Sequence, residues 1–156
     1  MTPQKRVYLS GGMEYADNEG RDWRHALQIS LETGFGWSVF NPNRESDLFF
    51  QTHYPSVDVR ALKTTDTLHY RNIVERLVEL DCREIAEHSD LVICYWDESA
   101  MRGAGTKGEL TIAKYFGKPV YMVTSIPVNE IPGWVLACTT RLFPGFEELH
   151  TFLQGL

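Results

Sequence analysis

Cysteine is scarce in this chain of 156 residues, and the patterns that mark disulfide or metal sites are missing. The three cysteines, Cys82, Cys94 and Cys138, are widely spaced and odd in number, which excludes a disulfide framework and favours a reducing compartment. The five histidines include no i,i+4 pair, so no metal site is expected. No apolar run approaches the roughly 20 residues of a bilayer span, and Met1 to Arg6 lack the apolar region of a signal peptide. We therefore expect a cytoplasmic protein.

Basic residues are also in deficit. Lys and Arg number 15 against 21 Asp and Glu, which gives a formal charge of −6 and a pI near 5.3. Duplex nucleic acid is excluded as the main partner, because phosphate contacts along a duplex need clustered cations. A small anion such as a mononucleotide still fits, since one arginine and a few backbone amides can hold it.

Short apolar runs alternate with segments of helical period, in a chain the size of one domain. Runs that end in turn residues predict strands at 7–10, 37–40, 91–95, 119–123 and 142–143. Apolar residues at helical spacing predict helices at 22–31, 70–87, 109–116 and 146–153. Residues 44–68 show neither period and are expected to form a long irregular stretch, either a lid or a partly ordered segment. The alternation predicts one α/β domain over residues 1–156, a Rossmann-like (flavodoxin-like) sandwich with a mostly parallel sheet of about five strands.

Unusual residues follow three of the predicted strands. They are Ser10-Gly11-Gly12, Asn41-Pro42-Asn43 and the loop from Asp97 to Glu109. Ligands of open α/β sheets bind at the carboxyl ends of the strands, so these three segments are the candidate site.

The glycine-rich loop has the most chemical content. Gly103, Gly105 and Gly108 allow a backbone to approach a ligand closely, and the predicted helix then begins at Glu109. A carboxylate in a first helical turn is kept ionised by the helix dipole, as a nucleophile requires, although Glu is also a routine choice there. The loop is no Walker motif. Gly103, Gly105 and Gly108 match the letters of the dinucleotide-binding motif G-x-G-x-x-G. That motif follows the first strand of its domain and needs an acidic residue about 20 positions further on. Here the glycines follow a later strand and position 128 is Val, so we do not expect a dinucleotide site.

Four motifs, taken together, resemble the nucleoside deoxyribosyltransferase-like superfamily. They are Val7 to Gly12, Ser89 to Asp97, Gly105 to Glu109 and Gly117 to Val120. In that family an apolar strand with Tyr, a helix carrying Asp, a second apolar strand, G-T-x-x-E, a helix and G-K-P-V follow one another. The resemblance runs from residue 7 to about residue 124. The superfamily also contains nucleoside monophosphate N-glycosidases, so the resemblance implies the chemistry more closely than the substrate.

The resemblance implies roles for four catalytic residues. Glu109 matches the family nucleophile, which attacks the anomeric carbon, and Tyr8 matches the tyrosine that contacts it. Asp81 or Asp97 would hold and protonate the leaving base. From the residues alone, Tyr8 is equally a core aromatic and Asp97 equally a loop residue that caps a turn.

The resemblance also implies a set of substrate-binding residues. Ser10, Gly11 and Gly12 would bind ribose hydroxyls or a phosphate through backbone amides and the Ser hydroxyl. Arg24 is either a phosphate ligand or a solvated surface arginine. The predicted set is Ser10, Gly11, Gly12, Arg24, Asn41, Gly105 and Thr106.

These features predict an enzyme that cleaves or transfers the N-glycosidic bond of a (deoxy)nucleoside or nucleoside monophosphate through a glycosyl-Glu109 intermediate. Hydrolysis and base exchange both fit. A catalytically silent nucleotide-binding or sensor domain and a purely structural α/β module are the other hypotheses. The Glu109 carboxylate favours the enzyme, because a binder of anionic ligands gains nothing from a negative group in its pocket.

The resemblance implies a homodimer or higher homo-oligomer, in which a neighbouring subunit completes the pocket. The C-terminal part of the chain has more aromatic residues than a small monomer needs, which also favours an oligomer. They are Trp134, Phe143 and Phe146. Small-molecule nucleosides or nucleotides are the expected partners, with no membrane partner. No metal or organic cofactor is expected, since the substrate supplies its own leaving group.

Overall fold

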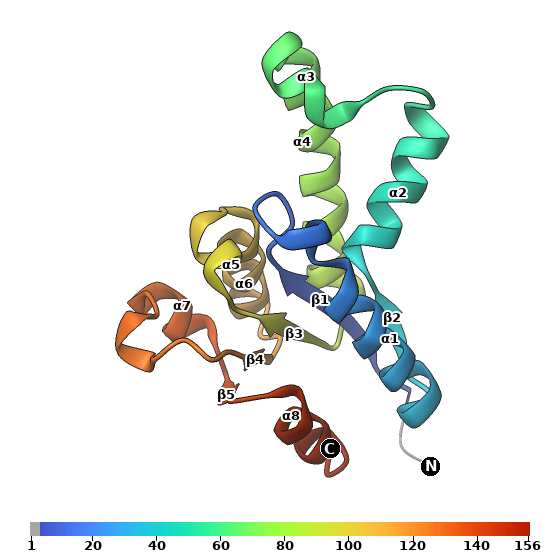
Figure 1. Cartoon of the computed structure of the whole chain (residues 1–156). Helices are drawn as coiled ribbons and strands as arrows, with labels where there is room; N and C mark the ends of the chain where they lie inside the picture. The colour runs from blue at the N-terminus through green and yellow to red at the C-terminus, as the bar shows by residue number, and fades with distance from the viewer. Residues whose placement is uncertain (1–3) are drawn as a thin grey trace.

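The computed structural model describes residues 4–156; residues 1–3 of the N-terminal segment considered above lie outside the described part. Five parallel strands form one sheet in the order β2-β1-β3-β4-β5, which confirms the predicted Rossmann-like sandwich (Figure 1). All five predicted strands are confirmed. They are β1 (Arg6–Gly11), β2 (Ser38–Phe40), β3 (Leu91–Tyr95), β4 (Val120–Val123) and β5 (Arg141–Phe143).

Helices flank the sheet on both faces. The α-helices are α1 (Arg21–Phe35), α2 (Pro42–His53), α3 (Val59–Thr65), α4 (Thr67–Arg83), α5 (Glu98–Arg102), α6 (Gly105–Tyr115), α7 (Gly133–Cys138) and α8 (Phe146–Leu153). Two short 3₁₀ helices, η1 (Asp17–Gly20) and η3 (Val128–Glu130), and a π-helical turn, η2 (Glu84–His88), join them. In residues 4–156 no helix combines the length and the apolar character that a membrane crossing requires.

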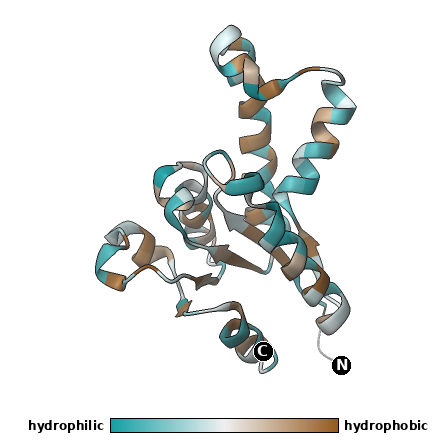
Figure 2. Ribbon diagram, in the orientation of Figure 1, coloured by the Kyte–Doolittle hydropathy of each residue, from teal (hydrophilic) through white to brown (hydrophobic). Residues whose placement is uncertain are grey.

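Alternation along β1 divides the core into two layers. Val7 and Leu9 belong to the cluster formed with α1 and α8, whereas Tyr8 belongs to the cluster that contains Leu110 of α6. Successive strand residues point to opposite faces, so even-numbered residues of β1 face α6. The strands at the centre of the fold include brown, hydrophobic stretches, and brown and teal residues are mixed along the helices (Figure 2). This alternation decides which β1 side chains reach the site described below.

The prediction for residues 44–68 was wrong, because this stretch contains most of α2 and all of α3. Helices α2, α3 and α4 form an arm that projects away from the sheet (Figure 1). Each begins with a side-chain cap: Asn41, Asp58 and Asp66 accept bonds from backbone amides in the first turns of α2, α3 and α4. Helices α2 and α3 bury few residues, so they lack the apolar stripe on which a helical period depends.

The helix predicted at 109–116 also begins earlier than expected. Helix α6 starts at Gly105, and a further short helix, α5, precedes it. Glu109 therefore lies beyond the first turn, which corrects the prediction that the helix dipole at the first turn stabilises its charge. The physical reason is that Gly105 and Gly108, which predicted a loop, are accommodated in the first turn of α6.

Candidate active site

Two hydrogen bonds hold the carboxylate of Glu109. The Tyr8 hydroxyl donates to Glu109 Oε2 at 2.6 Å, and the Ser10 hydroxyl donates to Oε1 at 2.6 Å. Both distances are in the range of charge-assisted hydrogen bonds. Each carboxylate oxygen thus has a dedicated donor, and the carboxylate is fixed in one orientation.

The fold brings these three residues together from positions about 100 apart in the sequence. Tyr8 and Ser10 are both even-numbered residues of β1, a central strand, so both face α6. Tyr8 stacks on Phe40 of β2, with ring centroids 5.2 Å apart and planes at 12°. On α6, Leu110 and Ala113 are completely buried, which fixes the rotation of the helix and hence the direction of Glu109.

Glu109 lines a pocket that it shares with Asp81 of α4. Burial and the nearby Glu109 carboxylate raise the pKa of Asp81 from 3.8 to about 8, while Tyr8 and Arg24 act in the opposite direction. The pocket therefore favours the protonated form of Asp81, the form that can donate a proton.

Burial also raises the pKa of Glu109, whereas the hydrogen bonds from Ser10 and Tyr8 and the charge of Arg24 lower it. Burial and the adjacent carboxylate raise the pKa of Tyr8 well above its ordinary value, so the phenol remains a donor. Since the two carboxyl groups interact, they titrate as a pair. Within this pair, the hydrogen bonds from Tyr8 and Ser10 favour the ionised form of Glu109. The pocket thus contains two coupled carboxyl groups in different environments, and such a pair can divide into an ionised and a protonated member, as acid–base chemistry requires.

The pocket has a volume of about 680 Å³, within the range of small-molecule sites. Its walls come from the turn after β1, the start of α6 and the arm. The predicted residues Gly11, Gly12, Gly105 and Thr106 line it, together with Asp81 and Glu109. The arm adds apolar and aromatic residues that sequence reasoning missed, among them Phe50, Val57, Val59, Tyr70 and Leu77.

The glycine pair after β1 is required by close packing. A Cβ on Gly12 would lie 1.9 Å from Ser99 Oγ, and a Cβ on Gly11 would lie 2.7 Å from the ring of Trp23. A side chain at either position would displace α5 or α1 from the site. Gly12 therefore lets the turn after β1 pack directly against α5.

Five predicted site residues lie outside the lining of this pocket. Two of them, Tyr8 and Ser10, bond to Glu109, and the other three are Asp97, Asn41 and Arg24. Asp97 caps α5, where it accepts bonds from the Ala100 amide at 3.0 Å and from the Ser99 hydroxyl at 2.5 Å. Asn41 caps α2 and donates to Gln28 at 3.0 Å. Both side chains are therefore engaged in the fold, and the substrate roles of Asp97 and Asn41 stay predictions.

One of the two predictions for Arg24 is corrected. Arg24 is only 1% exposed, bonds to backbone carbonyls and does not line the pocket, so it is not a solvated surface arginine. The basic residues that line the pocket are Arg21 and Arg60.

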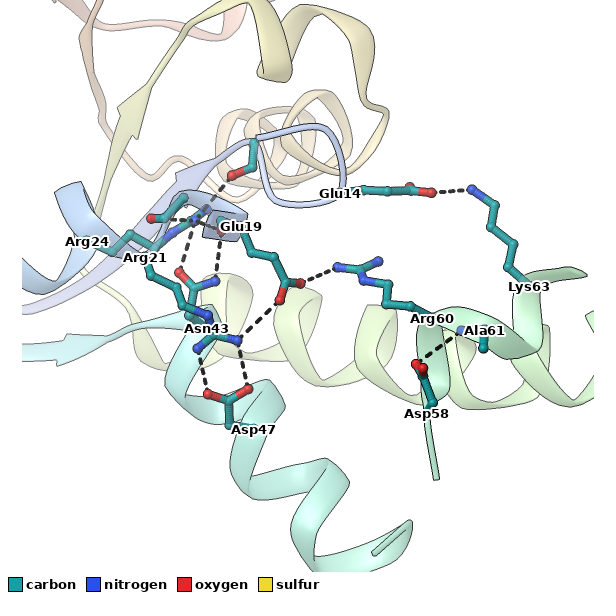
Figure 3. A network of polar contacts seen from close by, with 12 residues as sticks. Glu14, Glu19, Arg21, Arg24, Asn43, Asp47, Asp58, Arg60, Ala61 and Lys63 are labelled. Carbon is teal, nitrogen blue, oxygen red and sulfur yellow. Dashed lines mark hydrogen bonds and ion pairs between the residues drawn. The ribbon is translucent and has the colours of Figure 1, made fainter. Parts of the chain in front are cut away.

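Ion pairs connect the arm to the turn region after β1 (Figure 3). Arg21 binds both carboxylate oxygens of Asp47, at 2.6 and 3.0 Å, and Arg60 binds Glu19 at 2.8 Å. A further pair joins Lys63 to Glu14. These side chains are partly exposed, so each pair contributes little stability, and their main effect is to place α2 and α3 along the pocket.

The fold is similar to a solved structure of the CMP N-glycosidase BcmB from Clostridium botulinum. The two chains superpose with a TM-score of 0.55 at 17% sequence identity, over 96% of this chain and 98% of that chain. The sequence matches no protein-family model and no curated protein. At this identity the similarity shows a shared fold. The chain therefore has, over nearly its whole length, the α/β fold of an N-glycosidase.

Proposed function

We propose that this protein is an enzyme of the nucleoside deoxyribosyltransferase-like superfamily that cleaves or transfers the N-glycosidic bond of a nucleoside or nucleoside monophosphate. One observation carries the proposal: the Glu109 carboxylate, oriented by Tyr8 and Ser10, shares a pocket with Asp81, whose pKa is about 8. A retaining glycosidic reaction needs one ionised and one protonated carboxyl group.

In the first step the Glu109 carboxylate attacks the anomeric carbon of the sugar. The carbon–oxygen bond forms as the carbon–nitrogen bond breaks, and the bonding electrons leave with the base. Asp81 donates its proton to the departing base, so the base leaves neutral. The negative charge of Glu109 stabilises the oxocarbenium-like transition state, and Tyr8 and Ser10 keep the carboxylate in the attacking orientation.

In the second step an acceptor attacks the anomeric carbon of the glycosyl-Glu109 ester. Asp81, now ionised, takes the proton of the acceptor, and the Glu109 carboxylate is released. Water as acceptor gives hydrolysis, and a second base gives exchange. Both outcomes retain the configuration of the sugar, because each involves two displacements at the same carbon.

The substrate is proposed to be a nucleoside or its monophosphate. The similarity to the CMP N-glycosidase supports a monophosphate, as do the guanidinium groups of Arg21 and Arg60 in the pocket lining. Both arginines already form ion pairs with carboxylates of the chain. A phosphate would have to replace one of these partners, so the nucleoside and the monophosphate belong in the same assay.

We also propose a cytoplasmic homo-oligomer. Phe143 and Phe146 pack into the core of the chain, so these two aromatic residues are not free to form a subunit interface. Stronger support comes from the exposed Trp134 and from the exposed apolar residues Leu68 and Val78 of α4. Light scattering after size exclusion gives the mass in solution; a monomer at all concentrations would contradict this part of the proposal.

The experiment is a chromatographic assay of deoxyribonucleosides, ribonucleosides and their monophosphates, with and without a second free base. Wild type is compared with Glu109→Ala and with the control Glu98→Gln, which alters an exposed carboxylate on α5. Release of base, or a new nucleoside, that is lost only in Glu109→Ala supports the proposal. No product from any substrate at high enzyme concentration contradicts it and favours the silent nucleotide-binding domain.

A further inference from the structure

Arg24 bonds to the backbone on both sides of Ser10. From α1, its Nε donates to the Leu9 carbonyl at 3.3 Å, and one terminal nitrogen donates to the Gly11 carbonyl at 2.8 Å. Ser10 lies between these two carbonyls and donates its hydroxyl to Glu109. The guanidinium therefore fixes the strand end from which the Ser10 side chain reaches Glu109.

The other terminal nitrogen of Arg24 holds the rest of the turn after β1. It lies 3.3 Å from the carbonyls of Gly12, Glu19 and Gly20 and 3.2 Å from Asn43 Oδ1 (Figure 3). This turn has positive φ at Asn18, Glu19 and Gly20. Non-glycine residues rarely adopt that conformation, so the surrounding contacts must enforce it.

All the hydrogen-bond acceptors of Arg24 described here are uncharged oxygens. Burying a guanidinium without a directly bonded carboxylate is costly, because the lost hydration is only partly replaced. Its positive charge acts on the nearby carboxyl groups and lowers the pKa of both Glu109 and Asp81. Neutral hydrogen-bond donors could hold the turn without the cost of burying a charge. The charge of Arg24 therefore indicates a role beyond holding the turn.

We propose that Arg24 is a positioning residue of the active site: it fixes the backbone on both sides of Ser10 and places a buried positive charge behind the Ser10–Glu109 hydrogen bond. The effect on turnover rests on the proposed function, whereas the effect on the Glu109 carboxyl group does not. Arg24 is not a ligand of the substrate in this account.

The protonation of Glu109 depends on groups from several elements. These groups are Tyr8 and Ser10 of β1, Arg24 of α1, Asp81 and Cys82 of α4, and Cys94 of β3. Arg24 is the cation among those named. Its removal is therefore expected to raise the pKa of both Glu109 and Asp81, and to move the acid and alkaline limbs of the pH–rate profile in the same direction, to higher pH.

The test uses Arg24→Met, which removes the charge, and Arg24→Lys, which keeps it. Arg44→Met, at an exposed arginine of α2, is the control. Two readouts are measured: the pH profile of kcat and KM, and the titration of the Glu109 carboxyl carbon by NMR, assigned with Glu109→Gln. The second readout needs no turnover, so it decides the proposal even if the protein has no glycosidic activity.

Arg24→Met is expected to lower kcat by about 100-fold, the typical result of a small misplacement of reacting groups, with a smaller change in KM. Its Glu109 carboxyl carbon and both limbs should titrate at higher pH than in wild type. Arg24→Lys should restore the pH of titration but only part of kcat, because an ammonium cannot bond to all the carbonyls that the guanidinium reaches.

An increase in KM with unchanged kcat would overturn the proposal in favour of a ligand role. So would an unchanged Glu109 titration in a folded Arg24→Met variant. If Arg24→Met fails to fold, Arg24→Lys carries the test: wild-type kcat in that variant would refute the requirement for the guanidinium, and a reduced kcat at an unchanged Glu109 titration would support it.

Discussion

Tyr8→Phe is the most selective perturbation of the proposed nucleophile. It removes the hydroxyl that donates to Glu109 Oε2 at 2.6 Å and leaves the aromatic ring in place. The ring can keep its stacking on Phe40, where the centroids are 5.2 Å apart. The hydrogen bond from Ser10 to the other carboxylate oxygen also remains. Any change in activity is therefore due to the loss of a single donor.

The size of the effect follows from the charge of the acceptor. A hydrogen bond to a charged group contributes about 1.5–3 kcal/mol, and each 1.36 kcal/mol is about tenfold in rate. We therefore expect kcat/KM to fall by about 10- to 100-fold. Because the Tyr8 hydrogen bond lowers the pKa of Glu109, its loss raises that pKa, and the acid limb of the profile moves to higher pH. The core volume hardly changes, so Tm should fall by only a few degrees, at about 2–4 °C per kcal/mol for a chain of this size.

The assay measures base release across the pH range for wild type, Tyr8→Phe and Tyr115→Phe. Tyr115 is 82% exposed at the end of α6, so its variant controls for the loss of a phenol hydroxyl away from the site. An unchanged kcat/KM and an unmoved acid limb in folded Tyr8→Phe would refute the reasoning.

Two further predictions concern Asp81 and Gly12. Because its folded pKa is raised from 3.8 to about 8, Asp81 contributes stability that is fully present below about pH 3.8 and is lost as the pH rises through about 8. Urea unfolding at several pH values should therefore show wild type losing stability relative to Asp81→Asn towards pH 8, and parallel curves would contradict the raised pKa. Gly12→Ala should lower the free energy of unfolding by about 1–3 kcal/mol, because the added Cβ would lie 1.9 Å from Ser99 Oγ. Gly105→Ala, where a Cβ meets nothing within 4 Å, is the matched control, and equal stabilities in thermal unfolding would contradict the packing account.

The parts of the fold that pack on the sheet were predictable from the sequence. The apolar run at Leu91–Tyr95 indicated a strand covered on both faces, and it became the central β3. Helices α2 and α3 of the arm were not predicted, because a helical period reflects burial and these two helices bury little. A different signal was present: Asn41 followed by Pro42 is a typical helix start, and Asp58 and Asp66 are helix caps.

The candidate site was predictable where its residues follow strand ends. The resemblance implied a contact between Tyr8 and Glu109 and placed Ser10 among the substrate-binding residues. It did not indicate the hydrogen bond from Ser10 to Glu109, because that bond depends on the rotation of α6 over β1. From the sequence, Arg24 at the start of the first helix was either a phosphate ligand or a solvated surface arginine. Its buried position depends on carbonyls from segments far apart in the chain, and no local pattern shows such contacts.

The central claim is that Glu109 carries the sugar during the reaction. The most direct measurement is intact and peptide mass after acid quenching of the enzyme during turnover of the best substrate, in wild type and in Glu109→Gln. We predict that the wild-type mass increases by one glycosyl group and that the peptide containing Glu109 carries it, with no adduct in the variant. A glycosyl group on another residue, or undiminished base release by Glu109→Gln, would contradict the account.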